Sequence, residues 1–367
     1  QGARKIFTWA RDHGHLGKVE VLGFVDGDIS LKWIKDAGGR VNNLLTKGSL
    51  NHCQNQLRKT PEQHIADIKE VLSHAREMGI RMNIYFEDWS NGMRNSPQYM
   101  YQMLDALKEE SIERYMLPDT LGILNQQETY DFCLDMVTRY PELNFDFHAH
   151  NDYDLATANV YSAIKAGISG IHTTLNGLGE RAGNVPLSSV IGVVKDHFKY
   201  EMNVQEDRLY HASKMLESFS GIRIPANKPL IGENVFTQTS GIHADGDHKD
   251  NLYFNDLLPE RFGRKRSYAL GKMSGKASIL KNLEELGIEL SKEDARLVTE
   301  RVIELGDKKE IITKDDLPYI ISDVLRGKRV EERIKIRNFQ LSVARGLRSV
   351  ATVAIEIDCQ VHEETAS

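Results

Sequence analysis

The sequence predicts an α/β fold with a parallel sheet. Up to about residue 200, short apolar runs alternate with amphipathic stretches of helical period. Strands that alternate with helices pair in parallel, because each helix carries the chain back to the start of the next strand. We therefore expect six strands in this part of the chain, at residues 19–25, 41–45, 82–86, 115–117, 145–150 and 170–175.

Start and stop signals define the helices between these strands. Residues 60–63 (Thr-Pro-Glu-Gln) supply an N-cap, a proline at the first helical position and a capping box, and this helix ends at Gly79. Residues 125–128 form a second box of the same kind, which opens another helix. Asp154 is expected to cap a third helix, which ends at Gly167.

Six strand–helix units favour a (β/α)8 barrel over a doubly wound open sheet. A barrel of this kind has eight units and typically spans about 250 residues. The open sheet would carry a glycine-rich fingerprint directly after its first strand, and the sequence has none there. A barrel also predicts where chemistry takes place, because its active residues lie at the carboxyl ends of the strands.

The character of the sequence changes after residue 224. Residues 225–265 are rich in Gly, Asn, Asp and His, and three short helices are expected at 277–286, 292–305 and 314–325. A strand-like alternation follows at 349–360, and no partner is visible that would complete a sheet around it. Because residues 5–11 already resemble the middle of a helix, we expect an internal piece of a longer protein rather than a native chain with irregular ends.

Composition excludes several classes of protein. The chain has 367 residues, 40% of them hydrophobic, which is enough for two or three packed domains and argues against disorder. Its formal net charge of -6 argues against nucleic acid as the main partner. No run reaches the 18 or so apolar residues of a membrane helix, and no secretory signal is visible. Three widely spaced cysteines are typical of reduced thiols in a cytosolic protein.

His148 and His150 form the strongest local signal for a site. Residues i and i+2 of a strand point to the same face, about 7 Å apart at the backbone, so both imidazoles can bind one divalent ion. The alternative is a hydrogen-bonded polar pair. A metal needs further ligands, and Asn184, Asp119 and Glu87 are all available at neighbouring strand ends.

Two further candidates have simpler explanations beside them. Glu87 closes the third strand and is a candidate acid or base, or else a carboxylate paired with Arg81 or Arg94. His243 and Asp245 repeat the His-x-polar spacing in a loop region, where a solvated histidine is the simpler interpretation.

Four motifs in order resemble a known family of enzymes. HAHND at 148–152, NGLGERAGN at 176–184, GIHADG at 241–246 and GKMSGKASI at 271–279 are similar to the metal-dependent TIM-barrel acyltransferases that include 2-isopropylmalate, homocitrate and citramalate synthases. The resemblance extends from about residue 7 to about residue 330. Within the family, the pyruvate-using citramalate synthase branch is the closer match, through LGFVDG at 22–27, LLTKGS at 44–49, YFEDWSNG at 85–92 and LPERFGRKRSYALGK at 258–272.

The resemblance implies a role for each matching residue. His148 and His150 match metal ligands, and Asn184 matches an asparagine at or near the metal, whose identity (Zn, Mn or Co) stays open. Thr120 matches the threonine that binds the 2-oxo acid, and Leu22, Leu45 and Tyr85 match a pocket that favours pyruvate. Glu87, His243, Asp245 and Tyr253 match catalytic positions, and Asn251, Leu252 and Tyr253 match positions near acetyl-CoA. The resemblance places His243 in the neighbouring subunit's site, which implies a homodimer.

One departure from the family concerns the first strand. That strand carries an Arg-Asp pair in the family, whose Asp is a metal ligand, and this chain has no counterpart, since Arg11-Asp12 lies in a helical stretch. We therefore expect a barrel without its first two strands at 1–226, linker subdomains at 227–330 and the start of a regulatory domain at 331–367. The implied reaction is a Claisen-type condensation of acetyl-CoA with pyruvate, giving (R)-citramalate for isoleucine synthesis. The alternatives are condensation with 2-oxoisovalerate, a lyase of the same fold, and an inactive binding fragment.

Overall fold

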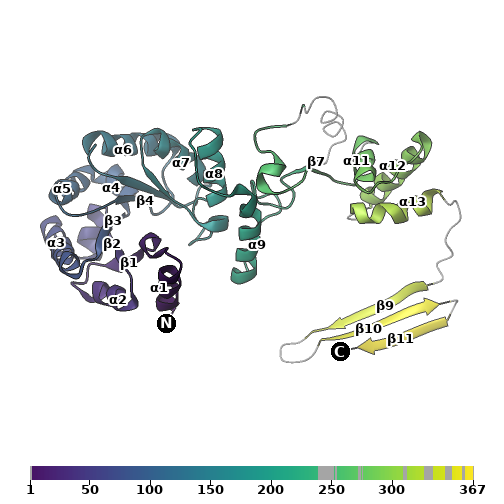
Figure 1. Cartoon of the computed structure of the whole chain (residues 1–367), viewed down its shortest axis with the longest axis horizontal. Coiled ribbons are helices and arrows are strands. Elements are labelled where there is room, and N and C mark those ends of the chain that lie inside the picture. The colour runs from purple at the N-terminus through teal and green to yellow at the C-terminus, as the bar shows by residue number, and fades with distance from the viewer. Residues whose placement is uncertain are drawn as a thin grey trace. The chain divides into compact units, whose positions relative to one another are not determined.

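The computed structural model describes residues 2–238, 252, 254–271, 274, 276–308, 312–325, 334–343, 349–357 and 360–366. The chain divides into two compact units, whose elements are labelled in Figure 1. The first unit comprises residues 1–235 with 261–263, and the second comprises residues 236–260 with 264–367. The three-part division expected from the sequence remains a prediction.

The first unit is built on one six-stranded parallel sheet. Its strands lie in sequence order, and every neighbouring pair is parallel. All six expected strands are present, so the alternation of strands and helices correctly predicts the α/β arrangement. They are β1 (Val21–Phe24), β2 (Val41–Lys47), β3 (Arg81–Glu87), β4 (Tyr115–Asp119), β5 (Phe145–Ala149) and β6 (Gly170–His172).

Helices connect these strands, and α3, α5 and α6 follow the outer side of the sheet (Figure 1). The helix expected near the start of the chain is present as α1. The helical elements of this part are α1 (Gly2–Asp12), η1 (Leu16–Lys18), α2 (Ile29–Ala37), η2 (His52–Gln56), α3 (Pro61–Met78), α4 (Trp89–Asn95), α5 (Pro97–Leu107), α6 (Gln126–Arg139), α7 (Ala156–Lys165), η3 (Leu175–Gly177), α8 (Leu187–Asp196), η4 (Glu206–Arg208) and α9 (Leu209–Ser220).

Two of the three predicted helix starts are correct. Capping boxes form at Thr60, before α3, and at Asn125, before α6, because each side chain accepts the amide hydrogen three residues on and receives a bond in return. The prediction for Asp154 is wrong. Its backbone is left-handed, with φ of 59°, and the first amide of α7 instead donates to the side chain of Asn151 at 3.1 Å. The Asp154 carboxylate instead accepts a hydrogen bond from Asn151 Nδ2 at 3.1 Å.

The core lies between the sheet and its covering helices. Leu44, Ile84, Phe86 and Phe147 alternate with inward polar residues along their strands and are fully buried. Trp89, at the start of α4, is buried in this core against the rings of Phe132 and Phe147. The opposite face of the sheet carries polar side chains, including Glu87 and His148.

The second unit contains a small helical cluster. It consists of the short parallel pair β7 (Thr237–Gln238) and β8 (Ser267–Tyr268), followed by α11 (Lys276–Glu285), α12 (Lys292–Asp307), η6 (Lys314–Asp316) and α13 (Leu317–Leu325). One further short helix, η5 (Pro259–Phe262), precedes β8 along the chain. Ile279, Leu283, Val298 and Val302 form the apolar centre of the cluster, as the expected helical periodicity requires.

The last part of the chain corrects one expectation. The strand-like segment that seemed to have no partner is β10 (Val350–Ile357), the central strand of a three-stranded antiparallel sheet. Its neighbours are β9 (Ile334–Ser342) and β11 (Gln360–Ala366). β11 is almost wholly polar, and β9 carries apolar residues at 334, 336, 339 and 341 whose alternation changes phase where its register with β10 is irregular. No helix in the described ranges is both long and apolar enough to cross a membrane.

Candidate active site

Two histidines meet at the carboxyl end of β5. The ring centroids of His148 and His150 lie 5.0 Å apart, with the ring planes 76° from parallel. His150 also forms an isolated antiparallel bridge with Asn184, which brings the NGLGERAGN loop against the strand end. The predicted metal-binding residues therefore come together in space, although Asn184 follows His150 by 34 positions in the sequence.

Burial keeps both imidazoles neutral at ordinary pH. Desolvation lowers the pKa of His148 to about 3, and the neighbouring His172 and His150 add to this effect. Desolvation also lowers the pKa of His150, with a smaller contribution from the Arg181 guanidinium. A neutral imidazole has a lone pair that can bind a cation, so the electrostatics suit a metal ligand.

Among the three residues left open as further ligands, Asn184 has the best geometry. Its Nδ2 donates to the carbonyl of Leu178 at 3.0 Å, whereas its Oδ1 is buried and has no hydrogen-bond partner among the described residues. Nδ1 of His150 is likewise buried, with no hydrogen-bond partner in the part of the chain that the structure describes. Buried polar atoms without partners are costly, and a bound cation would satisfy both of them.

The other two residues are already engaged. Asp119 is fully buried, and its oxygens accept the amide hydrogens of Ile123 and Leu124, each at 3.0 Å, so it organises a turn. Glu87 forms an ion pair with Lys47. No cluster of three His, Cys, Asp or Glu side chains suited to a metal occurs in the part of the chain that the structure describes. The two imidazoles and the amide oxygen thus fit part of a metal's coordination shell.

The glycines of the NGLGERAGN loop allow the two ends of the loop to lie close together. Gly183 has φ of +85°, and a Cβ there would lie 2.0 Å from the carbonyl oxygen of Gly177. Arg181 in the same loop binds Asp152 through two hydrogen bonds of 2.7 and 3.0 Å and donates to the carbonyl of Thr120 at 2.8 Å. The loop therefore links the ends of β4 and β5.

Thr120 is held by the backbone at the end of the neighbouring strand. The amide of Asp88 donates to Thr120 Oγ1 at 2.8 Å, which occupies an acceptor site of the hydroxyl and leaves its hydrogen available to a substrate. Asp88 is buried with φ of 67°, a left-handed conformation that is uncommon for aspartate. Strain of this kind is concentrated at functional sites.

The predicted apolar pocket is brought together in part. Leu45 and Tyr85 are register partners on β2 and β3. The Tyr85 ring lies 5.7 Å from that of His148, edge on, and stacks 6.2 Å from that of His172. Leu22 pairs instead with Asn43 and is 47% exposed, so its role remains a prediction.

Glu87 closes β3 beside Leu45 and Tyr85. The two arginines considered as its partners pair elsewhere, Arg81 with Glu113 and Arg94 with Glu128. Its actual partner is Lys47, which lies directly opposite on β2.

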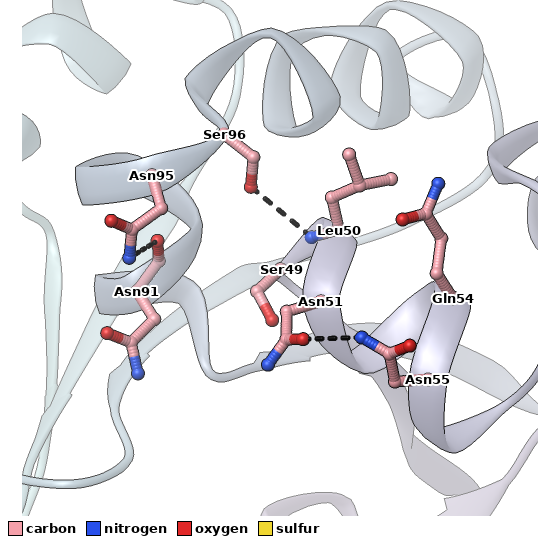
Figure 2. A pocket seen from close by; sticks show the side chains of 8 residues that line it. All are labelled: Ser49, Leu50, Asn51, Gln54, Asn55, Asn91, Asn95 and Ser96. Atoms are coloured by element: carbon pink, nitrogen blue, oxygen red, sulfur yellow. Dashed lines mark hydrogen bonds between the residues drawn. The ribbon is translucent and has the colours of Figure 1, made fainter.

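Two cavities open near these strand ends. The first, of about 340 Å³, contains Glu87 and Leu45 and is otherwise lined by Phe24, Val25, Thr46, Lys47, Gln56, Leu57 and His64. The second, of about 470 Å³, contains no predicted residue (Figure 2). Figure 2 shows the side-chain amides of Asn91 and Asn95 on α4 on one side and those of residues 51, 54 and 55 on the other. Asn55 Nδ2 donates to Asn51 Oδ1, and the backbone amide of Leu50 donates to the Ser96 hydroxyl. This lining is uncharged and, apart from Leu50, polar.

Several predicted residues cannot be placed. His243, Asp245, Asn251 and Tyr253 lie outside the described residues, so their catalytic and acetyl-CoA roles remain predictions. Leu252 is described and is 67% exposed.

Comparison with known proteins identifies the family. The family model described as HMGL-like matches residues 26–216, more than half of the chain. The chain belongs to the HMGL-like family. A second family model, described as homocitrate synthase post-HMGL domain-like, matches residues 230–310. The family resemblance drawn from the motifs is therefore confirmed.

Relatives of this HMGL-like chain carry several synthase names. (R)-citramalate synthase of Methanocaldococcus jannaschii is 30% identical over 85% of this chain and 63% of its own length. 2-isopropylmalate synthase of the same organism is also 30% identical, over 89% of this chain and 63% of its length. Homocitrate synthase of Sulfolobus acidocaldarius is 34% identical over 65% of this chain and 50% of its length. The chain thus spans less than two thirds of these relatives.

A solved structure supports the barrel. The HMG-CoA lyase of Bacillus subtilis superposes with a TM-score of 0.50 and 20% identity, covering 56% of this chain and 71% of the lyase. The six parallel strands of the HMGL-like unit are therefore part of a (β/α)8 barrel, and the predicted fold class is confirmed.

Sequence reasoning missed three residues of the site. Lys47 could have been found by aligning the ends of β2 and β3, because equal strand lengths place it opposite Glu87. His172 lies opposite His148 on β6, and the same alignment would have found it. Arg181 stands within a quoted motif but gives no local signal of its partners.

Proposed function

We propose that this protein catalyses a Claisen-type condensation of acetyl-CoA with a 2-oxo acid, with pyruvate as the preferred acceptor and (R)-citramalate and CoA as products. The observation that carries the proposal is the arrangement of His148, His150 and Asn184 beside the Leu45–Tyr85 wall at one end of the barrel. Barrel enzymes carry out their chemistry at this end. The names of the relatives support the same class of reaction.

The 2-oxo acid would bind between Thr120 and the apolar wall. The Thr120 hydroxyl donates its free hydrogen to the substrate carboxylate, since the Asp88 amide already occupies one of its acceptor sites. Leu45 and Tyr85 contact the methyl group of pyruvate, and a branched side chain would collide with them. A single methylene changes selectivity by only about 1–3 kcal/mol, so strong discrimination needs this steric clash.

His148, His150 and the Asn184 oxygen would hold a divalent metal, which as a Lewis acid makes the ketone carbon more electrophilic. Glu87, working with His243, removes a proton from the acetyl methyl group. The methyl carbon then bonds to the ketone carbon, and the ketone oxygen gains a proton. Water finally cleaves the thioester, and CoA leaves as the thiol.

A homodimer completes this proposal. His243, Asp245 and Tyr253 of a second copy would enter the site, with Asn251 and Leu252 near acetyl-CoA. The product would feed isoleucine synthesis, which is a reaction series of soluble metabolites and suits a cytosolic enzyme.

The second candidate is 2-isopropylmalate synthesis from 2-oxoisovalerate. A relative with this name is as similar to the chain as one named (R)-citramalate synthase, at 30% identity each. The Leu45–Tyr85 wall favours pyruvate over this larger acid.

Release of CoA thiol from acetyl-CoA tests the proposal. We would use protein expressed from its complete gene, with pyruvate or 2-oxoisovalerate, and with or without added Zn, Mn or Co. Preference for pyruvate is the expected result. Preference for 2-oxoisovalerate would overturn the pocket argument and leave the condensation intact, whereas no release with either acid would refute condensation and favour a binding role.

Metal content tests the role of the histidines, with His150→Ala as the test variant and His197→Ala as its control. The His150→Ala variant removes one imidazole from the cluster and leaves the Leu45–Tyr85 wall in place, so the bound metal should fall well below one ion per chain. His197→Ala, on the surface beyond α8, should retain the metal content of the wild type.

A further inference from the structure

Lys47 is a charged residue at the site that the reaction described above does not use. It ends β2, directly opposite Glu87 at the end of β3, and its ammonium pairs with Oε2 of that carboxylate. The Lys47 side chain is only 10% exposed and that of Glu87 is 28% exposed. Glu87 is the only acidic residue that lines the 340 Å³ cavity formed by these described residues.

The backbone of Lys47 is held on both sides. Its amide donates to His64 Nε2 at 3.2 Å, and its carbonyl accepts a hydrogen bond from the Tyr99 hydroxyl at 3.0 Å. Both partners are buried, with His64 1% exposed and Tyr99 3% exposed. These contacts fix the point from which the lysine side chain extends, so the ammonium has a defined position against Glu87.

Burying an ammonium in an ion pair of this kind costs desolvation free energy, so the presence of the pair needs an explanation. Removing an ammonium from water carries a large penalty that the attraction of one carboxylate offsets only in good geometry. Apolar residues could fill the same place at less cost, and the cavity wall here is already partly apolar, with Phe24, Val25 and Leu45. An ion pair at the carboxyl end of barrel strands therefore points to the reaction rather than to stability.

We propose that Lys47 is the positioning residue for Glu87. Its ammonium binds Oε2 and so fixes the orientation of the carboxylate. Oε1 accepts no hydrogen bond from the part of the chain that the structure describes, and this oxygen remains available to take the acetyl proton. The inference rests on the proposed function, because it deepens the role given there to Glu87.

The expected effect of Lys47→Met is a loss of kcat with little change in KM for the 2-oxo acid. The acid is bound by Thr120 and the apolar wall, which the variant leaves intact, whereas the carboxylate loses its fixed orientation. A misplacement of about 1 Å at a reacting group can lower the rate by about 10²-fold. Lys47→Arg keeps a cation at this place and should recover part of the loss.

Lys195→Met is the matched control. Lys195 pairs at 2.6 Å with Glu206, and the two side chains are 36% and 6% exposed, so this pair is also partly buried, although its lysine is more exposed than Lys47. Lys195 lies near the far end of α8, about 12 Å along the helix from the first helical residue, Leu187. The variant should lose stability and keep its kcat.

A double-mutant cycle decides whether Lys47 acts through Glu87. Wild type, K47M, E87Q and K47M/E87Q are compared in CoA-release assays, with tryptophan fluorescence and metal content confirming that each protein is folded. If Lys47 works through Glu87, K47M causes no further loss once E87Q is present. Partial restoration of K47A activity by added ethylammonium, which the cavity can admit, would also support positioning by a cation.

Three results would overturn the proposal. The two single losses could multiply in the double variant, K47M could raise KM alone, or K47M could be no more impaired than K195M. Failure of the proposed function itself is distinguishable, since the wild type would then release no CoA with either 2-oxo acid.

Discussion

Replacing His64 should remove a defined part of the pH dependence of stability. His64 lies on α3, is 1% exposed, and accepts the amide hydrogen of Lys47 through Nε2 at 3.2 Å. A protonated imidazole would direct an N–H at that amide, so the folded protein needs the neutral ring. Burial, as the largest cause, lowers the pKa of His64 to about 4 from an ordinary value of 6.5. His64→Gln retains an acceptor for the Lys47 amide and cannot titrate.

The magnitude follows from proton linkage. Between pH 6.5 and pH 4 the unfolded chain binds a proton at His64 and the folded chain does not, so acidification favours unfolding. The contribution is fully present above pH 6.5 and is lost as the pH falls toward 4. Each pH unit in that window costs about 1.4 kcal/mol, so moving from pH 7.5 to pH 5 lowers the free energy of unfolding by about 2 kcal/mol through this residue.

Urea unfolding followed by tryptophan fluorescence measures this quantity. All three tryptophans, Trp9, Trp33 and Trp89, belong to the barrel unit, so the signal reports that unit. The difference in unfolding free energy between pH 7.5 and pH 5 is determined for the wild type and for H64Q. The pKa of His148 is also lowered by burial. Its contribution to the pH dependence of the unfolding free energy is the same in both proteins, so it cancels in the comparison.

The wild type should lose about 2 kcal/mol more than H64Q over this interval. Equal losses in the two proteins would refute the reasoning, because they would mean that His64 accepts a proton in the folded state at no cost. If imperfect packing destabilises H64Q, its unfolding free energy falls by the same amount at both pH values, and the comparison stays valid.

Two further substitutions test the loops around the site. Gly183→Ala should lower the free energy of unfolding by about 1–3 kcal/mol more than Gly221→Ala, and should reduce metal binding, because both positions have positive φ but only the former places a Cβ against a backbone oxygen. Equal effects in urea unfolding would count against the close loop approach. Thr120→Val should lower the free energy of unfolding by about 1–3 kcal/mol, because it leaves the Asp88 amide without an acceptor. Thr120→Ser keeps the hydroxyl and should retain the stability of the wild type. A stable valine variant with an unchanged KM for the 2-oxo acid would contradict both roles of the hydroxyl.

Local patterns in the sequence were sufficient to predict the six strands of the parallel sheet, several of the helices and the type of barrel. The capping boxes at Thr60 and Asn125 form as expected, because each depends only on residues within one turn. Alternation along β5 likewise predicts that His148 and His150 share a face, since that property belongs to any extended strand. Interactions of this range are encoded by neighbouring residues.

Only the tertiary structure decided which groups meet. The Lys47–Glu87 pair depends on the register between two strands 40 residues apart, and the contact of Asn184 with His150 depends on a loop that glycines allow to fold back. Of the two partners of β10, β11 carries no apolar pattern, and the apolar alternation of β9 changes phase at an irregularity in its register, although both strands pair with β10 along its length. Periodicity reports how each segment faces the core, whereas register and loop closure arise from packing over the whole chain and leave no mark on any one segment.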